Sequence, residues 1–160
     1  MGHVMGQKPY VIRTSDCIDS QISRLGFLEL NEFLTDDEKR KYLIESKDDG
    51  WINHLSTKSG EKSVLHFKPT QYKDFERVAL MKMEPHAVQP WHTDGNRKTV
   101  LIYPLSDNYA PGSTMNGLYH GPVLLDVTRE HAVFNNEYER INLQIGFNVG
   151  LKESWHLLQN

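Results

Sequence analysis

The chain has 160 residues, the usual length of one domain and enough to bury a core. Its formal net charge of −3 provides no basic surface for nonspecific nucleic-acid binding, and the single cysteine, Cys17, excludes an internal disulfide. No stretch has the apolar run of a signal peptide or of a membrane span. We therefore expect one domain over residues 1–160, located in the cytoplasm, without nucleic-acid or membrane partners.

The N-terminal third of the chain predicts one clear helix. The first twenty residues fit either a loose arm or an edge strand. Thr35 with Glu38 three residues later is a capping box, so a helix should begin at Asp36. It should end near Ser46, because an Asp-Asp-Gly run follows. Residues 51–70 are ambiguous, with a turn expected near Ser59-Gly60.

Strands dominate the rest of the sequence. Five are predicted from β-branched and aromatic runs, at Arg77–Met83, Thr99–Leu105, Val123–Val127, His131–Asn135 and Arg140–Val149. Short strands separated by Gly, Pro and Asn turns favour a sandwich or a barrel. The long segment Ser106–Gly121 is rich in Asn, Gly and Pro, and we interpret it as a mobile cover with Tyr109 or Tyr119 near a pocket mouth.

The last predicted strand has two chemically different faces. One face is apolar and carries Ile141, Leu143, Ile145 and Phe147. The other is polar and carries Arg140, Asn142 and Gln144. The apolar face should pack on the N-terminal helix or its neighbours. The polar face then lines an interior cavity or, as in an ordinary sandwich, meets water, and the sequence alone leaves both arrangements open.

Two histidines and an aspartate form the main candidate site. On an extended segment, residues i and i+2 point to the same side, so His92 and Asp94 should face one cavity. His131 must come from a second strand passing the same point. These residue types are the ligands of a 2-His-1-carboxylate iron centre, which leaves positions open for O2 and a co-substrate. Arg140, nine positions after His131, is placed to bind a co-substrate carboxylate.

The stretch from Pro85 to Val149 resembles the Fe(II)- and 2-oxoglutarate-dependent dioxygenases, most closely their prolyl-hydroxylase and aspartyl/asparaginyl-hydroxylase-like branch. The matching segments are Trp91–Asp94, Arg97–Leu105, Gly121–Leu125, His131–Asn136 and Glu139–Leu143. The resemblance implies a mainly β fold, a double-stranded β-helix (jelly-roll, cupin-like) with N-terminal helical support. The metal-binding β core should span about residues 64–150.

The resemblance also implies residue roles. Three residues are the implied iron ligands: His92, Asp94 and His131. Arg140 is the implied ligand of the 5-carboxylate of 2-oxoglutarate, the co-substrate. Tyr103 stands where family members often place a second co-substrate contact, and Asn142 shares the face of Arg140. The implied activity is an oxidoreductase that hydroxylates a peptidyl or small-molecule substrate, and the sequence indicates neither the substrate nor the oligomeric state.

Some features favour other interpretations. The gap between Asp94 and His131 is short, so the loops over the site must be reduced. Gly146 stands where nucleic-acid dealkylating dioxygenases place an arginine, which disfavours that branch. The alternatives are a cupin-like metal enzyme that does not use 2-oxoglutarate and a non-catalytic β-barrel binding module. His86 and His120 are alternative ligands, disfavoured because neighbouring Pro and Gly residues place them in turns.

Overall fold

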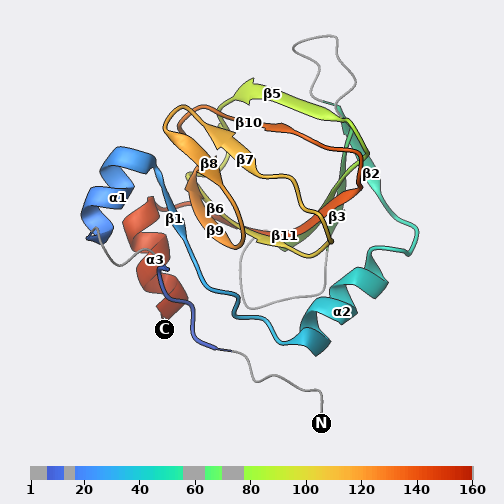
Figure 1. The fold of residues 1–160 in the computed structure, drawn as a ribbon, viewed down its shortest axis with the longest axis horizontal. Coiled ribbons are helices and arrows are strands. Elements are labelled where there is room, and N and C mark those ends of the chain that lie inside the picture. Colours follow the sequence, from blue (N-terminus) through green and yellow to red (C-terminus); the bar gives the residue numbers. More distant parts are fainter. Residues whose placement is uncertain (1–6, 13–16, 56–63, 70–77, 160) are drawn as a thin grey trace.

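Two antiparallel sheets face each other in a mainly β jelly roll (Figure 1). The computed structural model describes residues 7–12, 17–55, 64–69 and 78–159. The major sheet has the strand order β1 (Phe27–Glu29), β9 (Val123–Asp126), β6 (Thr99–Pro104), β11 (Arg140–Phe147), β4 (Val78–Met83), β3 (Val64–Pro69) and β2 (Ile52–Leu55). The minor sheet has the order β5 (Val88–His92), β10 (His131–Phe134), β7 (Gly112–Thr114) and β8 (Gly117–Tyr119).

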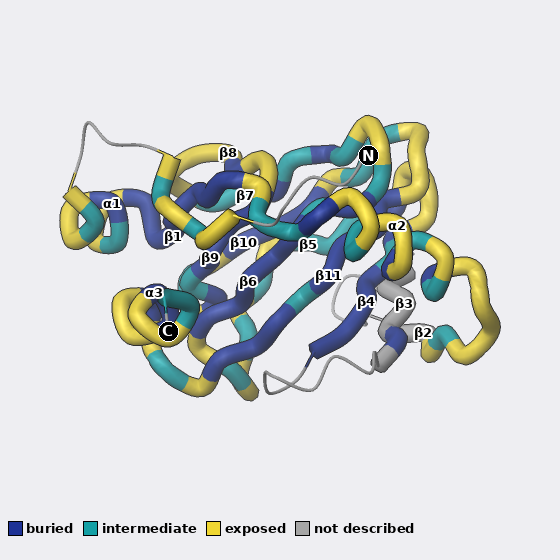
Figure 2. The backbone as a smooth tube through the Cα atoms, turned by 90° about the horizontal axis from the view of Figure 1, so that it is seen from below, coloured by how far each residue is buried: buried dark blue, intermediate teal, exposed yellow. Residues whose placement is uncertain are grey.

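Strand β11 lies at the centre of the major sheet, between β4 and β6. Its two faces meet different surroundings, as the sequence predicts. The apolar face joins the main buried cluster, which includes Leu28, Tyr42, Leu101, Tyr103 and Trp155. The polar face turns toward the minor sheet, where Arg140 and Gln144 line a cavity. Strands β4, β6, β9 and β11 are mostly dark blue in Figure 2, because most of their residues are buried.

Helices from both ends of the chain support the outer side of the major sheet (Figure 1). Helix α2 spans Asp36–Glu45 and begins with the predicted capping box, in which Glu38 N donates to Thr35 Oγ1 at 3.1 Å and Thr35 N to Glu38 Oε1 at 3.0 Å. Helices α1 (Ile18–Leu25) and α3 (Leu151–Gln159) were not predicted. Leu151 and Trp155 of α3 pack on the apolar face, so the helical support is not only N-terminal.

The five predicted strands are confirmed. One ends at the predicted residue, and the other four end one or two residues earlier than predicted. The ambiguous region contains β2 and β3, while the expected turn at Ser59-Gly60 lies outside the described residues. The segment Ser106–Gly121, predicted to be a mobile cover, is not a loop throughout; Tyr119 lines the cavity, and the mobility of the segment stays a prediction. Its second half forms the β7–β8 hairpin, which pairs with β10 and extends the minor sheet.

The absence of a side chain at Gly112 explains how the hairpin closes. A Cβ atom at this position would lie 1.9 Å from Tyr119 Cζ, so only glycine lets the Tyr119 ring cross the neighbouring strand. Gly112 and Tyr119 are opposite each other in the β7–β8 register, and Tyr119 is 2% exposed. In the sequence, Gly112 looks like an ordinary loop glycine. In the structure it lies in a sheet, where the packing of Tyr119 requires it.

Among the described helices, none is long and apolar enough to cross a membrane.

Candidate metal centre

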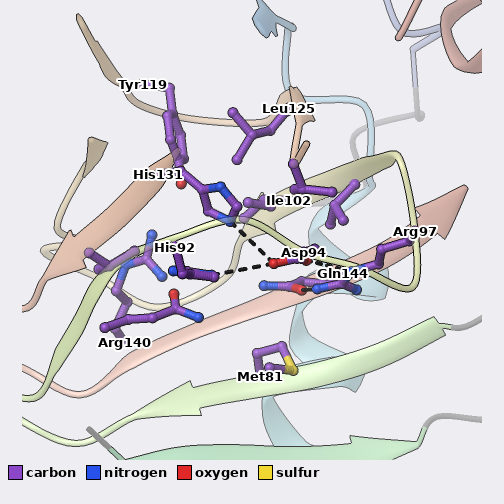
Figure 3. A pocket seen from close by; sticks show the side chains of 14 residues that line it. Met81, His92, Asp94, Arg97, Ile102, Tyr119, Leu125, His131, Arg140 and Gln144 are labelled. Carbon is purple, nitrogen blue, oxygen red and sulfur yellow. Dashed lines mark hydrogen bonds and ion pairs between the residues drawn. The ribbon is translucent and has the colours of Figure 1, made fainter. Parts of the chain in front are cut away.

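The predicted triad converges at the inner side of the minor sheet. His131 and His92 are directly opposite each other in the β10–β5 register, which brings their rings to a centroid distance of 4.2 Å. Asp94 follows β5 by two residues, and its backbone N–H donates to Val127 O at 2.8 Å. The ligand atoms of the three side chains lie within 4.8 Å of one another (Figure 3). Asp94 Oδ1 is 3.3 Å from His92 Nε2 and 3.5 Å from His131 Nε2.

Each imidazole is held by a carbonyl two residues earlier in its own chain segment. His92 Nδ1 lies 2.7 Å from Pro90 O, and His131 Nδ1 lies 2.8 Å from Arg129 O. A carbonyl oxygen only accepts hydrogen bonds, so each Nδ1 must carry the proton. Both Nε2 atoms then face Asp94 Oδ1: a protonated ring donates a hydrogen bond to it, whereas a neutral ring has an Nε2 lone pair that a metal ion can accept. Backbone carbonyls orient metal-binding histidines in the same way.

The charges of the triad are strongly coupled. Burial disfavours the Asp94 carboxylate, but hydrogen bonds from His131 and His92, together with the Arg97 charge, hold the pKa of Asp94 well below its ordinary value. Burial lowers the pKa of His92, yet its bonds to Asp94 and to Pro90 O outweigh that effect and raise it above its ordinary value. The carboxylate is thus ionised at neutral pH, as a metal ligand must be.

A second arginine, which the sequence analysis did not single out, binds the same carboxylate. Arg97 Nε donates to Asp94 Oδ2 at 2.9 Å, and Arg97 Nη2 donates to Gln144 Oε1 at 3.3 Å. In Figure 3, Arg97 and Gln144 lie to one side of Asp94, and Arg140 lies on the other side, beyond His92. The spacing of Asp94 and Arg97, three residues apart in a turn, is the signal in the sequence for this pair.

Arg140 is buried with an unpaired donor. The residue is 3% exposed, its Nε donates to Ala110 O at 3.0 Å, and its Cζ lies 4.1 Å from the centroid of the Tyr109 ring. Among the described residues, Arg140 Nη1 has only the Met83 sulfur as a hydrogen-bond partner, at 3.9 Å, and Nη2 has none. No carboxylate of the described residues forms an ion pair with Arg140. A buried guanidinium without an anion is costly, so this edge is suited to an anionic ligand.

The cavity around the triad is small, and more of its lining is polar than apolar. Its volume is about 40 Å³, enough for a few water molecules. The polar residues lining it beyond the triad are Gln89, Arg97, Tyr119, Arg140 and Gln144. The apolar lining comes from Met81, Val100, Ile102, Leu125, Val127 and Val133. The structure therefore brings His92, Asp94, His131 and Arg140 to one cavity, as predicted.

Tyr103 and Asn142, the other two residues predicted to bind the co-substrate, do not line this cavity. Tyr103 pairs in register with Leu143, so it shares the apolar outer face of the sheet. Its hydroxyl accepts hydrogen bonds from the backbone N–H groups of Phe33 and Leu34 at 3.0 and 3.1 Å. The prediction that Tyr103 contacts a co-substrate is therefore wrong. Asn142 is buried and donates to the Tyr109 hydroxyl at 2.8 Å, which places it behind the Tyr109–Arg140 pair.

No protein-family model matches the chain, and no curated protein matches it. The structure is similar to the crystal structure of a Pseudomonas putida prolyl-4-hydroxylase, with a TM-score of 0.58 and 12% identity, covering 82% of this chain and 97% of that one. Two further solved structures, both at 16% identity, are less similar, and nothing about this chain is inferred from them. They are to a cupin domain from Bordetella pertussis Tohama I (TM-score 0.39, 56% of this chain, 96% of that one) and to Rhodobacter sphaeroides SigE in complex with the anti-sigma ChrR (TM-score 0.43, 86% and 68%).

At 12% identity the likeness to the prolyl-4-hydroxylase shows the fold alone. The chain has a jelly roll similar to that of the prolyl-4-hydroxylase, and the similarity extends over 97% of that neighbour. Because one fold hosts many activities, the function must be argued from the residues of the site.

Proposed function

We propose that this chain is an Fe(II)- and 2-oxoglutarate-dependent dioxygenase that hydroxylates a peptidyl or small-molecule substrate. The observation that carries the proposal is the convergence of His92, Asp94 and His131 on the cavity that also holds the buried, unpaired edge of Arg140. The implied Fe(II) ligands and the implied co-substrate anchor come from three different parts of the chain. Their meeting in one cavity supports a common role.

The residues present fit both implied groups. Two neutral imidazoles and one carboxylate are the ligand set of the facial triad that non-haem Fe(II) oxygenases use. Arg140 Nη2 is a buried donor without a partner, which a carboxylate of the co-substrate would satisfy. Bound Fe(II) together with 2-oxoglutarate would supply O2 activation coupled to oxidative decarboxylation, with hydroxylation of a C–H bond.

The protein would contribute orientation and a water-poor environment. The backbone carbonyls of Pro90 and Arg129 hold the two imidazoles with Nε2 inward. Tyr109 covers one face of the Arg140 guanidinium, which leaves its edge as the free binding surface. Burial of Arg140 and His131 keeps these two side chains largely away from bulk water, which strengthens the charged hydrogen bonds that they form.

The small cavity favours a second candidate, a cupin-like metal enzyme that does not use 2-oxoglutarate. A volume of about 40 Å³ holds a metal ion with a few waters, whereas a five-carbon dicarboxylate requires side chains to move. The two candidates therefore differ in whether 2-oxoglutarate binds.

The deciding experiment is an anaerobic titration of the Fe(II)-loaded protein with 2-oxoglutarate. Chelation of Fe(II) by the 2-oxo acid produces a visible charge-transfer absorption, which we expect in the wild type. Asp94→Ala should abolish the absorption by removing the metal, and Arg140→Ala should weaken it by removing the anchor. Asp37→Ala, on an exposed helix surface, is the control that should behave as wild type.

The subsequent measurement is succinate formation with O2 in the presence of candidate peptides and small molecules. Metal binding without any response to 2-oxoglutarate would reject the dioxygenase and support the cupin-like enzyme. A wild type that binds no divalent metal would reject both and leave a binding module.

A further inference from the structure

The two oxygens of Asp94 have different surroundings. Oδ1 faces the Nε2 atoms of both histidines, at 3.3 and 3.5 Å. Oδ2 points away from them and accepts a hydrogen bond from Arg97 Nε at 2.9 Å. Both side chains are largely shielded, with 13% of Asp94 and 24% of Arg97 exposed, so this ion pair is screened less than a surface pair.

Arg97 is itself fixed by a second contact. Its Nη2 donates to Gln144 Oε1 at 3.3 Å, and Gln144 belongs to β11, the central strand of the major sheet. A planar guanidinium that donates from Nε to one partner and from Nη2 to another has little freedom to rotate. Arg97 thereby connects the turn that follows β5 to β11, a strand that is paired on both sides.

This arrangement restricts how Asp94 can bind a metal. A free carboxylate rotates about its last side-chain bond and ligates through either oxygen or through both. With Oδ2 held by Arg97, only Oδ1 faces the point on which the two imidazoles converge. Ligation through one oxygen uses one coordination position, and the position that the second oxygen would take stays open for another ligand.

We propose that Arg97 is a positioning residue of the metal centre, which holds Asp94 Oδ2 so that the metal is bound through Oδ1 alone, with Gln144 keeping Arg97 in place. The inference rests on the metal site of the proposed function. It does not depend on the co-substrate, so it applies equally to the cupin-like candidate.

The test compares metal binding by Arg97→Ala, Arg97→Lys and a matched control. Arg40→Ala is that control, because Arg40 pairs with Asp37 at the same spacing of three residues and the same distance of 2.9 Å, but on the surface of α2. Mn(II) affinity is measured by the electron paramagnetic resonance signal of the free ion, without turnover. Loss of an outer partner of a metal ligand typically weakens metal binding about 10–100-fold, which is the loss expected for Arg97→Ala. Arg40→Ala should bind as wild type.

A spectroscopic readout separates positioning from a general loss of structure. Infrared difference spectra between metal-bound and metal-free protein are recorded with ¹³C-labelled aspartate carboxylates. The symmetric and antisymmetric carboxylate stretching bands are far apart when one oxygen binds the metal and close together when both do. We expect the wide separation in the wild type and a narrower one in Arg97→Ala. Arg97→Lys should recover part of the metal affinity, because lysine keeps the positive charge but lacks the planar set of donors of the guanidinium. Circular dichroism of the metal-free variants verifies that they are folded.

The outcomes are distinct. Wild-type affinity and wide band separation in Arg97→Ala would overturn the inference while leaving the metal centre intact. If the wild type binds no Mn(II), or binds it equally after Asp94→Ala, the proposed function fails and the inference fails with it.

Discussion

The Tyr109 ring lies flat against the guanidinium of Arg140, with Arg140 Cζ 4.1 Å from the ring centroid. Tyr109 is fixed from behind by Asn142, which belongs to the same strand as Arg140 and donates to the Tyr109 hydroxyl at 2.8 Å. Arg140 lines the cavity, and its Nη2 has no hydrogen-bond partner. The aromatic contact compensates part of the cost of burying the cation, and an anion would compensate the remainder.

Removal of Asp94 should remove metal binding without unfolding the protein. At a free Mn(II) concentration 100 times its dissociation constant, the wild type should gain about 2.7 kcal/mol in free energy of unfolding. Asp94→Ala should gain none, because the two imidazoles alone bind weakly. The measurement is chemical denaturation with and without Mn(II), with Asp37→Ala as the control on α2. An equal gain in Asp94→Ala would place the metal elsewhere.

Truncation of Arg140 should affect the co-substrate and spare the metal. Arg140→Ala should weaken 2-oxoglutarate binding to the Fe(II)-loaded protein by about 2–4 kcal/mol, the scale of losing one partner of a buried charged hydrogen bond. Arg140→Lys should recover part of that loss. Calorimetry with Mn(II) and then 2-oxoglutarate measures the two affinities separately. Unchanged 2-oxoglutarate affinity in Arg140→Ala would favour the cupin-like enzyme over the dioxygenase.

Tyr103 should matter for stability and not for the site. Tyr103→Phe leaves the N–H groups of Phe33 and Leu34 without their acceptor, which should cost about 1–3 kcal/mol in free energy of unfolding. Metal and 2-oxoglutarate affinities should be unchanged, because the hydroxyl lies on the outer face of the sheet. A loss of 2-oxoglutarate affinity with unchanged stability would return Tyr103 to the role that the family resemblance implies.

The same residue predicts a pH dependence at the alkaline limit. Burial raises the pKa of Tyr103 from 10.0 to about 12 in the folded protein. Because the folded state favours the neutral phenol, its contribution is complete below pH 10 and is lost as the pH rises toward 12. The difference in free energy of unfolding between wild type and Tyr103→Phe should therefore shrink over this window. A difference that stays constant from pH 9 to about pH 12 would contradict the assignment.

Gly112 should be irreplaceable only while Tyr119 is present. Gly112→Ala places a Cβ atom 1.9 Å from Tyr119 Cζ, so the hairpin must shift, at a cost of about 1–3 kcal/mol in free energy of unfolding. In a Tyr119→Ala background the same substitution should cost much less, because the obstructing ring is gone. A double-mutant cycle by denaturation measures this coupling, and additive effects would contradict the packing described here.

The sequence by itself determined those features that depend on local chemistry. The capping box at Thr35 and Glu38 fixes where α2 begins, because the two side chains satisfy each other's backbone within one turn. The alternation of β11 fixes its two faces, because side chains point in opposite directions at each step. The residue types at 92, 94 and 131 predict a metal site, since two imidazoles and a carboxylate are the ligand set of a facial triad.

Only the tertiary structure decided how distant segments meet. His92 and His131 become neighbours through the β5–β10 register, and Tyr103 turns outward because it pairs with Leu143. The β7–β8 hairpin has strands of three residues, too short for a periodic signal, and it exists because β10 supplies its partner. The contact between Arg97 and Gln144 joins segments 47 residues apart. Such contacts depend on strand order and register, which are properties of the assembled sheets and not of any one segment.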